Sequence, residues 1–297
     1  MRSEIELFDA HCDSLTAKGI FENTAHLKRG DLLKYRRCLQ VFAICAEYEY
    51  AYSYTMRYIG RFERLCRKWG FSPVKTRADL ENARYGAILA LEGANALCRS
   101  IAALDRFYNM GVRLLTITWN TENAAAGSIA QETDGGLTEY GKKLIRKCEK
   151  KGVVVDLSHI GDRSFDEVCA FMKKPFVCSH SNSRTVNPRF KRNLTDDRFK
   201  KLAKKGGVAG INFCCDFLGG KKTDDILRHI EHFLSLGGEK SIGFGSDFDG
   251  IELLPDECSG ASFFETLYNA MLKRNYPESL VKDIMFNNFY RVFESIL

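Results

Sequence analysis

Short apolar runs alternate with longer amphipathic segments along the whole chain, and this alternation limits the folds open to it. Eight runs are nearly continuous in apolar residues. They are residues 5–10, 39–46, 87–91, 114–118, 153–157, 176–179, 208–213 and 242–245. Runs of this length are typical of strands that are buried on both faces, as in a parallel sheet. We therefore predict eight buried strands.

The segments between these runs carry helix signals. The predicted helices are residues 52–69, 101–109, 138–151, 164–172, 195–205, 224–236, 261–273 and 278–295. Thr195 is followed by two aspartates, which favours a helix start because a side-chain oxygen caps the first N–H groups and the helix dipole attracts carboxylates. Gly111 and Gly152 indicate helix ends. Strands that alternate with helices indicate βαβ units.

Eight strands are the number that closes a (β/α)8 TIM-like barrel. The chain has 297 residues, and α/β barrels commonly use about 250 residues as one domain. It has five prolines and no repeat or Pro-rich linker, so we predict a single α/β barrel domain over residues 1–297, ending in a C-terminal helix. The alternative is an open doubly wound sheet. Its Gly-x-Gly-x-x-Gly fingerprint is absent after the first run, where the sequence reads FDAHCDSL.

Composition narrows the function classes. The chain is 45% hydrophobic and 28% charged, which is typical of a soluble globular protein. Its formal net charge of +6 is a mild excess that favours a solvated surface over a nucleic-acid-binding face. The basic segment 142–151 (KKLIRKCEKK) carries an apolar stripe at helical spacing and is interpreted in the same way. No segment approaches the ~18 apolar residues that span a membrane, so we predict no membrane partner.

The eleven cysteines are predicted to be reduced thiols. The N-terminal sequence has no basic stretch followed by an apolar run, so it does not resemble the secretory signals that accompany disulfide frameworks. None of the cysteines forms a Cys-x-x-Cys pair, which argues against a structural zinc site of the thiolate type. We therefore expect a cytoplasmic protein.

Polar side chains follow five of the predicted strands, at the end where a barrel carries its functional residues. These residues are His11, Asp13, Glu92, His159, His180 and Asp247. Each of them alone has an ordinary structural explanation, such as a hydrogen-bonded histidine or a carboxylate in water. Together they place three of the six histidines and three carboxylates on one rim, which favours a functional site.

The mixture of residue types predicts a pair of divalent cations. His11 and Asp13 are two positions apart in an extended segment, so their side chains point the same way and suit zinc or a similar metal. His159 and His180 would bind a second cation, and Glu92 would bridge the two through its two carboxylate oxygens. Between two cations a water loses its proton near neutral pH and becomes a nucleophile.

The remaining carboxylate, Asp247, is placed to accept that proton and return it. Five metal ligands and a base form a hydrolytic site. The residues alone thus predict a metal-dependent hydrolase.

The sequence resembles the membrane (renal) dipeptidase family, zinc metallopeptidases of the amidohydrolase-like superfamily. The matching stretches run through nearly the whole chain. They are FDAHCDSL, ALEGANAL, MGVRLLTITWNTENAAAGS, GVVVDLSHIGDRSFDEV, PFVCSHSNSR, RNLTDD, GGVAGINF, IGFGSDFDGI and NFYRVF. The resemblance implies a (β/α)8 barrel that binds two Zn²⁺ ions per chain and cleaves dipeptides, including some with a D-residue in second position, to free amino acids.

The resemblance also implies residue roles. By motif match, His11 and Asp13 hold the first zinc, His159 and His180 the second, and Glu92 both, while Asp247 corresponds to the catalytic aspartate. Arg192, in RNLTDD, corresponds to the arginine that pairs with the C-terminal carboxylate of the dipeptide. The planar guanidinium suits that role because it meets a carboxylate bidentately.

One position departs from the best-known family members, which carry a substrate-contacting histidine after the fourth strand. Here LLTIT is followed by Trp119. Indole donates one hydrogen bond and stacks, but carries no positive charge. We interpret this as a subfamily trait in which the zinc ions, with Asn120 or Asn123, supply the missing oxyanion contact. Trp119 and Asn120 are therefore predicted substrate contacts.

Two other interpretations stay open. The same barrel could act on a phosphoester, a lactone or a nucleic acid, or the chain could be a non-catalytic binding protein on this scaffold. The complete set of dipeptidase motifs favours a small-molecule dipeptide as the partner. A homodimer is possible, because relatives often form dimers.

Overall fold

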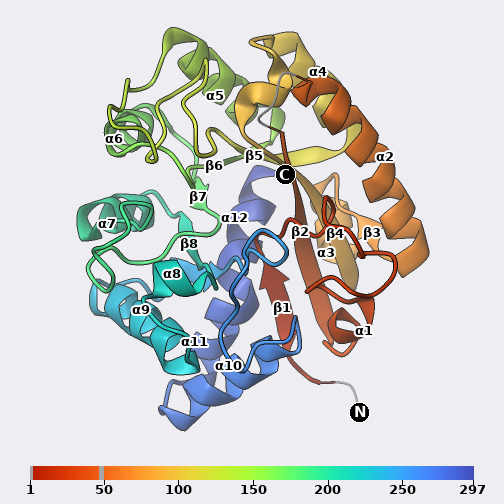
Figure 1. The fold of residues 1–297 in the computed structure, drawn as a ribbon, viewed down its shortest axis with the longest axis vertical. Coiled ribbons are helices and arrows are strands. Elements are labelled where there is room, and N and C mark those ends of the chain that lie inside the picture. The colour runs from red at the N-terminus through yellow and green to blue at the C-terminus, as the bar shows by residue number, and fades with distance from the viewer. Residues whose placement is uncertain (1–2, 47–49) are drawn as a thin grey trace.

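The structure is a computed structural model that describes residues 3–46 and 50–297. Eight parallel strands form a closed ring in the order β2-β1-β9-β8-β7-β6-β5-β4, and pairing between β2 and β4 closes it (Figure 1). The strands are β1 (Glu6–Asp9), β2 (Arg37–Cys45), β4 (Tyr85–Glu92), β5 (Val112–Thr116), β6 (Val154–Asp156), β7 (Val177–Cys178), β8 (Val208–Ile211) and β9 (Ile242–Phe244). The predicted (β/α)8 barrel is confirmed.

Helices surround the ring. They are α2 (Ala51–Trp69), α4 (Ile101–Met110), α5 (Glu139–Lys151), α6 (Asp162–Phe171), α7 (Asp196–Lys204), α9 (Thr223–Ser235) and α10 (Phe263–Lys273). Several begin where the sequence indicated: the Thr195 side chain caps α7 by accepting a hydrogen bond from the Arg198 N–H, and Gly111 ends α4 in the left-handed conformation. The pattern of caps and glycines therefore located these helix ends to within one or two residues.

Some elements were not predicted from the sequence. The two-residue strand β3 (Ser72–Pro73) pairs with the start of β4. Short helices also form at α1 (Arg29–Leu32), α3 (Arg77–Asn82) and α8 (Cys215–Leu218), with a 3-10 turn at Ala94–Leu97. The single helix predicted over residues 278–295 consists of α11 (Glu278–Lys282), a π-helical turn (Asp283–Asn287) and α12 (Asn288–Ile296). These pieces are too short for a periodic pattern to reveal.

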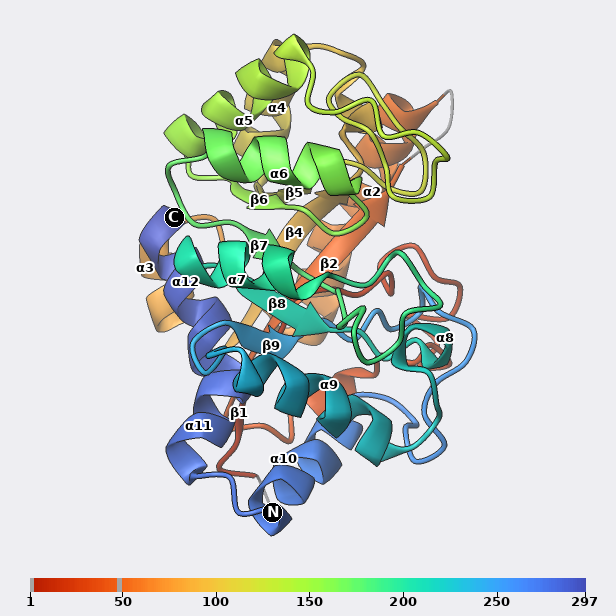
Figure 2. The same ribbon diagram turned by 90° about the vertical axis from the view of Figure 1, so that its left-hand side faces the viewer.

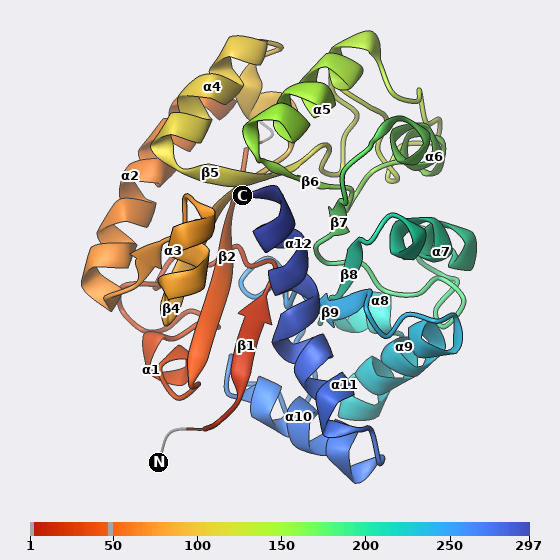
Figure 3. The same ribbon diagram turned by 180° about the vertical axis from the view of Figure 1, so that it is seen from behind.

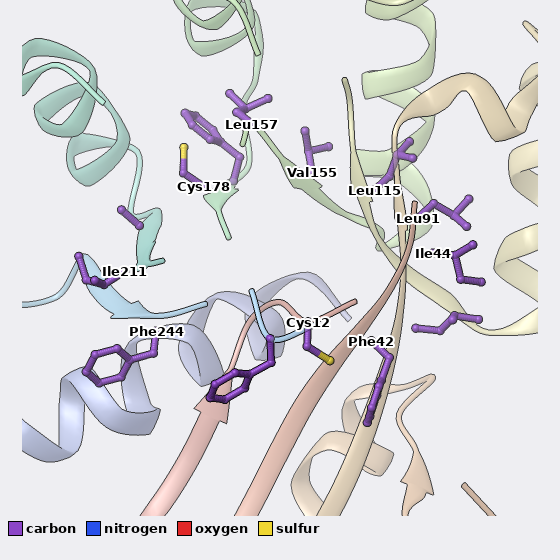
Figure 4. Close-up of a cluster of buried hydrophobic side chains, with 14 of the residues drawn as sticks. Cys12, Phe42, Ile44, Leu91, Leu115, Val155, Leu157, Cys178, Ile211 and Phe244 are labelled. Carbon is purple, nitrogen blue, oxygen red and sulfur yellow. The ribbon is translucent and has the colours of Figure 1, made fainter. Parts of the chain in front are cut away.

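Side chains along each barrel strand alternate between two buried layers. Figure 4 shows Phe42, Ile44, Leu91 and Phe244 pointing outward from the ring, where they belong to the large core cluster shared with the surrounding helices. The intervening residues form a second cluster inside the barrel. It includes Phe8, Leu39, Val41, Ile88, Leu114, Val154, Val177 and Val208. The near-continuous apolar runs of the sequence follow from this double burial.

Helix α12 closes one end of the barrel. It lies across the ring when the molecule is seen from behind (Figure 3). The Phe8 ring centroid lies 5.6 Å from that of Phe289 and 5.0 Å from that of Phe293. Gly243 of β9 has no room for a side chain, because a Cβ there would overlap the Phe289 ring. The predicted C-terminal helix thus fills the base of the barrel.

The strands point away from α12, toward the end where α8 and the long loops lie (Figure 2). That end is the rim on which the sequence placed the candidate functional residues. Among the helices that the structure describes, none combines the length and the apolar character needed to cross a membrane.

The base of the barrel generates a stability prediction. Phe289 is buried against Phe8 and Gly243, so Phe289→Ala leaves a cavity and is expected to lower the free energy of unfolding by about 3–5 kcal/mol. Phe289→Leu refills part of that volume and should cost less. Urea unfolding monitored by circular dichroism measures both. Equal stability of wild type and Phe289→Ala would contradict the role given to α12.

Candidate metal centre

Six side chains predicted from the sequence come together at the C-terminal rim of the barrel. His11 and Asp13 follow β1, Glu92 ends β4, His159 and His180 follow β6 and β7, and Asp247 follows β9. All six are buried, with at most 9% of their surface exposed. Residues from five strands therefore share one small, nearly solvent-free region.

Glu92 lies at the centre of this cluster. Its Oε1 atom is 3.7 Å from His11 Nε2, 3.2 Å from His159 Nε2 and 3.4 Å from His180 Nε2. His11 Nε2 is also 3.4 Å from Asp13 Oδ2 and 3.8 Å from Asp247 Oδ1. One carboxylate oxygen thus lies among three imidazoles, and His11 faces two further carboxylates.

The donor atoms of the cluster form three overlapping groups, each with all its atoms within 4.8 Å of one another. The groups are His11, Asp13 and Glu92; Glu92, His159 and His180; and His11, His180 and Asp247. Glu92 belongs to two of them. Imidazole and carboxylate donors in groups of three suit zinc and similar divalent metals.

Unpaired polar atoms show that these residues fit a cation. Both ring nitrogens of His11 and Oδ1 of Asp13 are buried without a hydrogen-bond partner. A buried polar atom without a partner is costly, unless it coordinates a metal. His159 Nε2 and His180 Nε2 also lie only 2.9 Å apart. A divalent cation would satisfy Nε2 of His11, which faces the cluster, the Asp13 carboxylate and the two facing Nε2 atoms.

The electrostatics of the cluster indicate missing positive charge. Burial raises the pKa of Glu92 to about 8 and that of Asp247 to about 6. Burial by itself lowers the pKa of His11. The carboxylates of Glu92, Asp13 and Asp247 together have a larger effect and raise this pKa to about 10. Burial holds the pKa of His159 and His180 well below the ordinary value. A bound cation would favour ionised carboxylates and neutral imidazoles instead.

Two site residues have an uncommon backbone conformation. His159 has φ of 67° and Asp247 has φ of 62°, a region that side chains other than glycine disfavour. The carbonyl of His159 accepts hydrogen bonds from the backbone N–H of Ile129 and from the hydroxyl of Ser128, and the Asp247 N–H donates to the His11 carbonyl. Such strain persists where the surroundings fix it, and it is common at functional sites.

Two buried aspartates, which sequence reasoning did not select, link neighbouring strands beneath the cluster. Asp9 of β1 accepts hydrogen bonds from the N–H and the hydroxyl of Ser246, at 2.8 and 2.6 Å. Asp156 of β6 accepts equivalent bonds from Ser179, at 2.8 and 2.6 Å. Each serine directly precedes a site residue, Asp247 or His180. A single aspartate within each apolar run was the available sequence signal.

A third residue that the sequence did not reveal holds Asp247. The side-chain N–H of Asn212 donates to Asp247 Oδ2 at 2.8 Å, so the other carboxylate oxygen stays free to face His11. Asn212 is itself held by Asn182, which accepts from its backbone N–H and donates to its carbonyl. This pair orients the Asp247 carboxylate.

A cavity of about 460 Å³ adjoins the cluster. Trp119 and Asn120 line it, together with Phe217 and the loop of residues 249–253. Six carboxylates also line it, from Asp13, Glu92, Asp216, Asp247, Asp249 and Glu252. No lysine or arginine of the described chain is among the lining residues. The cavity is therefore strongly acidic.

The predicted substrate contacts differ in their positions. The Trp119 ring centroid lies 6.4 Å from that of His159, and Asn120 Oδ1 lies 2.9 Å from His159 Nδ1. Arg192 does not line the cavity. Its guanidinium lies behind His180, where it donates to the His180 carbonyl and to Ser181 Oγ, and its buried Nε has no partner.

A closed parallel barrel with buried imidazoles and carboxylates at its C-terminal rim defines a metal-dependent barrel hydrolase. Residues 3–296 match the family model described as membrane dipeptidase (peptidase family M19), and the chain belongs to this family. The resemblance recognised in the sequence is thereby confirmed.

Sequence relatives agree with that assignment. The chain is 31% identical to an uncharacterized protein of Klebsiella pneumoniae, over 74% of this chain and 86% of the relative. It is 32% identical to an uncharacterized dipeptidase of Schizosaccharomyces pombe, over 72% of this chain and about half (53%) of that longer protein.

Solved structures share the fold. The metallopeptidase described as dipeptidase AC superposes with a TM-score of 0.89 and 26% identity, over 99% of both chains. A metallopeptidase of Rhodobacter sphaeroides, solved with a phosphinate mimic of the dipeptide L-Ala-D-Ala, has a TM-score of 0.88 and 24% identity. That comparison covers 99% of this chain and 100% of the other.

The cluster generates a pH prediction for the metal-free protein. Glu92 and His11 have raised pKa values in the folded state, so the folded protein holds more protons than the unfolded chain above pH 6.5. The free energy of unfolding should therefore fall as pH rises from about 6.5 to 8. His159 and His180, whose pKa values are lowered, act in the opposite direction, most strongly below pH 6.5, and this effect fades through the lower part of the window.

Chemical denaturation of chelator-treated protein at several pH values measures this fall. Glu92→Gln should make it shallower, and metal-loaded protein should not show it. A metal-free protein whose stability is constant or rises between pH 6.5 and 8 would contradict this description of the cluster.

Proposed function

We propose that this protein is a zinc-dependent dipeptidase that hydrolyses dipeptides, including some with a D-residue in second position, to free amino acids. Membership of the dipeptidase family supports the reaction. The convergence of His11, Asp13, Glu92, His159 and His180 carries the proposal, because these residues form two donor groups that share one carboxylate. The D-residue tolerance follows from the family resemblance alone.

The distances within the cluster support the ligand roles that the resemblance implies. His11 and Asp13 would hold one zinc ion and His159 and His180 the other, with Glu92 contacting both. A pair of bound zinc ions supplies the positive charge that polarises a peptide carbonyl and lowers the pKa of an attacking water. Burial of all five ligands keeps bulk water from competing with these contacts.

Asp247 is the proposed proton carrier. It takes the proton from the attacking water and delivers it to the leaving amine. Its Oδ2 accepts from Asn212, so Oδ1 is the oxygen available for this transfer. Burial raises the pKa of Asp247 to about 6 in the metal-free protein, and bound cations would oppose this shift and keep the carboxylate ionised as a proton acceptor.

The acidic cavity supports a substrate with a free amine. Asp216 and Glu252 lie on its outer lining, are exposed, and form no ion pair with any described residue. They would attract the ammonium group of a dipeptide. These exposed carboxylates therefore favour a substrate that carries a free amine.

Arg192 is proposed to pair with the carboxylate at the other end of the dipeptide. Its Nε and one N–H on each terminal nitrogen have no assigned acceptor. Phe217 lines the cavity and its ring lies 5.9 Å from the Arg192 guanidinium carbon. A substrate carboxylate would have to reach the arginine beside this ring.

A dipeptide panel with L-L and L-D pairs tests the function. We expect chelator-sensitive hydrolysis of some member, about two zinc ions per chain, and a kcat about 10²–10⁴-fold lower in Asp247→Asn. Asp197→Asn, at an exposed carboxylate on α7, serves as the matched control and should keep wild-type kcat. If the protein hydrolyses a phosphotriester or a lactone and no dipeptide, the proposed dipeptidase activity is wrong and the alternative substrate class is correct. Zinc binding without turnover would indicate a binding protein.

A second prediction concerns Trp119, which lines the cavity where best-known relatives carry a histidine. Trp119→His adds a group that can carry positive charge, and one added hydrogen bond to a developing oxyanion is worth about tenfold in rate. We therefore expect kcat/KM to change by about tenfold for at least one dipeptide. Unchanged turnover of the whole panel would contradict a role for this position in substrate handling.

A further inference from the structure

A chain of buried hydrogen bonds extends from His180 away from the metal cluster. His180 Nδ1 lies 2.7 Å from Ser179 Oγ, and Ser179 Oγ lies 2.6 Å from Asp156 Oδ2. All three residues are buried, with exposures of 0–1%. The opposite ring nitrogen, His180 Nε2, faces Glu92 and His159. The chain thus connects a buried carboxylate to one side of the ring, while the other side faces the cluster.

The direction of each hydrogen bond can be assigned by counting protons. Asp156 Oδ1 accepts from the backbone N–H groups of Ser158 and Ser179, and Oδ2 accepts from the hydroxyl of Thr116. The carboxylate therefore acts only as an acceptor. Ser179 has one hydroxyl proton and must donate it to Asp156, because two oxygen lone pairs 2.6 Å apart would repel. Toward His180, Ser179 can only accept.

We infer that Asp156 and Ser179 are positioning residues that fix the proton of His180 on Nδ1, so that the lone pair of Nε2 faces the metal cluster. This inference rests on the proposed metal centre and deepens it. An imidazole can coordinate a metal only through a nitrogen that carries no proton, and a fixed ring orientation and tautomer raise its affinity for the metal.

The imidazole proton of His159 is also on Nδ1, but a different residue fixes it there. Its Nδ1 lies 2.9 Å from Oδ1 of Asn120, an oxygen that can only accept, so the proton is on Nδ1 here too. The two Nε2 lone pairs then face each other at 2.9 Å, and neither nitrogen can donate to the other. Such a pair is unfavourable until a cation binds between the rings. Asn120, predicted as a substrate contact, also sets the tautomer of His159.

The Asp9–Ser246 pair provides a matched comparison. Ser246 donates to Asp9 at 2.6 Å and links β9 to β1, as Ser179 links β7 to β6. No imidazole nitrogen is bonded to Ser246 Oγ among the described contacts. Ser246→Ala therefore removes an equivalent link between strands without touching a histidine tautomer.

Asp156→Asn tests the inference directly. The amide nitrogen that replaces Oδ2 would donate to Ser179 Oγ, so the Ser179 hydroxyl would turn toward His180 Nδ1 and the imidazole proton would move to Nε2. ¹⁵N NMR of the imidazoles in metal-free protein reports this proton. We expect Nδ1–H in the wild type and Nε2–H in Asp156→Asn, with Zn²⁺ binding weakened about 10–100-fold in a chelator competition assay.

Two further variants keep the test interpretable. If Asp156→Asn does not fold, Ser179→Ala should still weaken Zn²⁺ binding, because Nδ1–H loses its acceptor. Ser246→Ala should lower thermal stability but leave the His180 tautomer unchanged. The inference is overturned if the wild type has Nε2–H, if folded Asp156→Asn keeps both the tautomer and the zinc affinity, or if Ser246→Ala weakens zinc binding as much as Ser179→Ala.

These outcomes separate the inference from the proposed function. A wild type that binds Zn²⁺ and hydrolyses dipeptides, with an unchanged Asp156→Asn variant, rejects only the positioning role. A wild type that binds no Zn²⁺ rejects both.

Discussion

Glu92 Oε1 lies within 3.7 Å of the Nε2 atoms of three histidines, in a region almost without solvent, and the arrangement of the barrel rim depends on this crowding. The facing Nε2 lone pairs of His159 and His180, 2.9 Å apart, repel each other, and the two rings would separate if the backbone allowed it. Eight parallel strands that close on themselves prevent this, because each strand end is held by two neighbours.

The polar contacts around the cluster also hold its residues close together. Asp9 and Asp156 each bind a serine on the neighbouring strand, and each serine precedes a site residue, so the position of Asp247 or His180 is coupled to two strands at once. Asn212 fixes the Asp247 carboxylate in turn. A site that must hold charges close together requires such support, since an error of about 1 Å can remove most of its chemical effect.

The sequence predicted the barrel and the cluster because both depend on strong, periodic signals. Apolar runs at regular intervals revealed the strands, and polar residues after Ala10 and Leu91 stood out against them. Asp9 and Asp156 interrupt apolar runs, but the sequence does not show whether such a residue faces water or accepts buried hydrogen bonds, and Asn212 gave no clearer signal. The strand β3 and the π-helical turn are set by tertiary contacts, and the position of Arg192 behind His180 follows from loop packing that periodicity does not encode.

The most direct test of the central claim is anomalous X-ray diffraction from crystals of the zinc-loaded protein at the zinc edge. Two peaks about 3.5–4 Å apart are expected, one beside His11 and Asp13, the other beside His159 and His180, with the Glu92 carboxylate between them. Zinc peaks held by other residues, or no peak in this cluster while dipeptides are still hydrolysed, would contradict it.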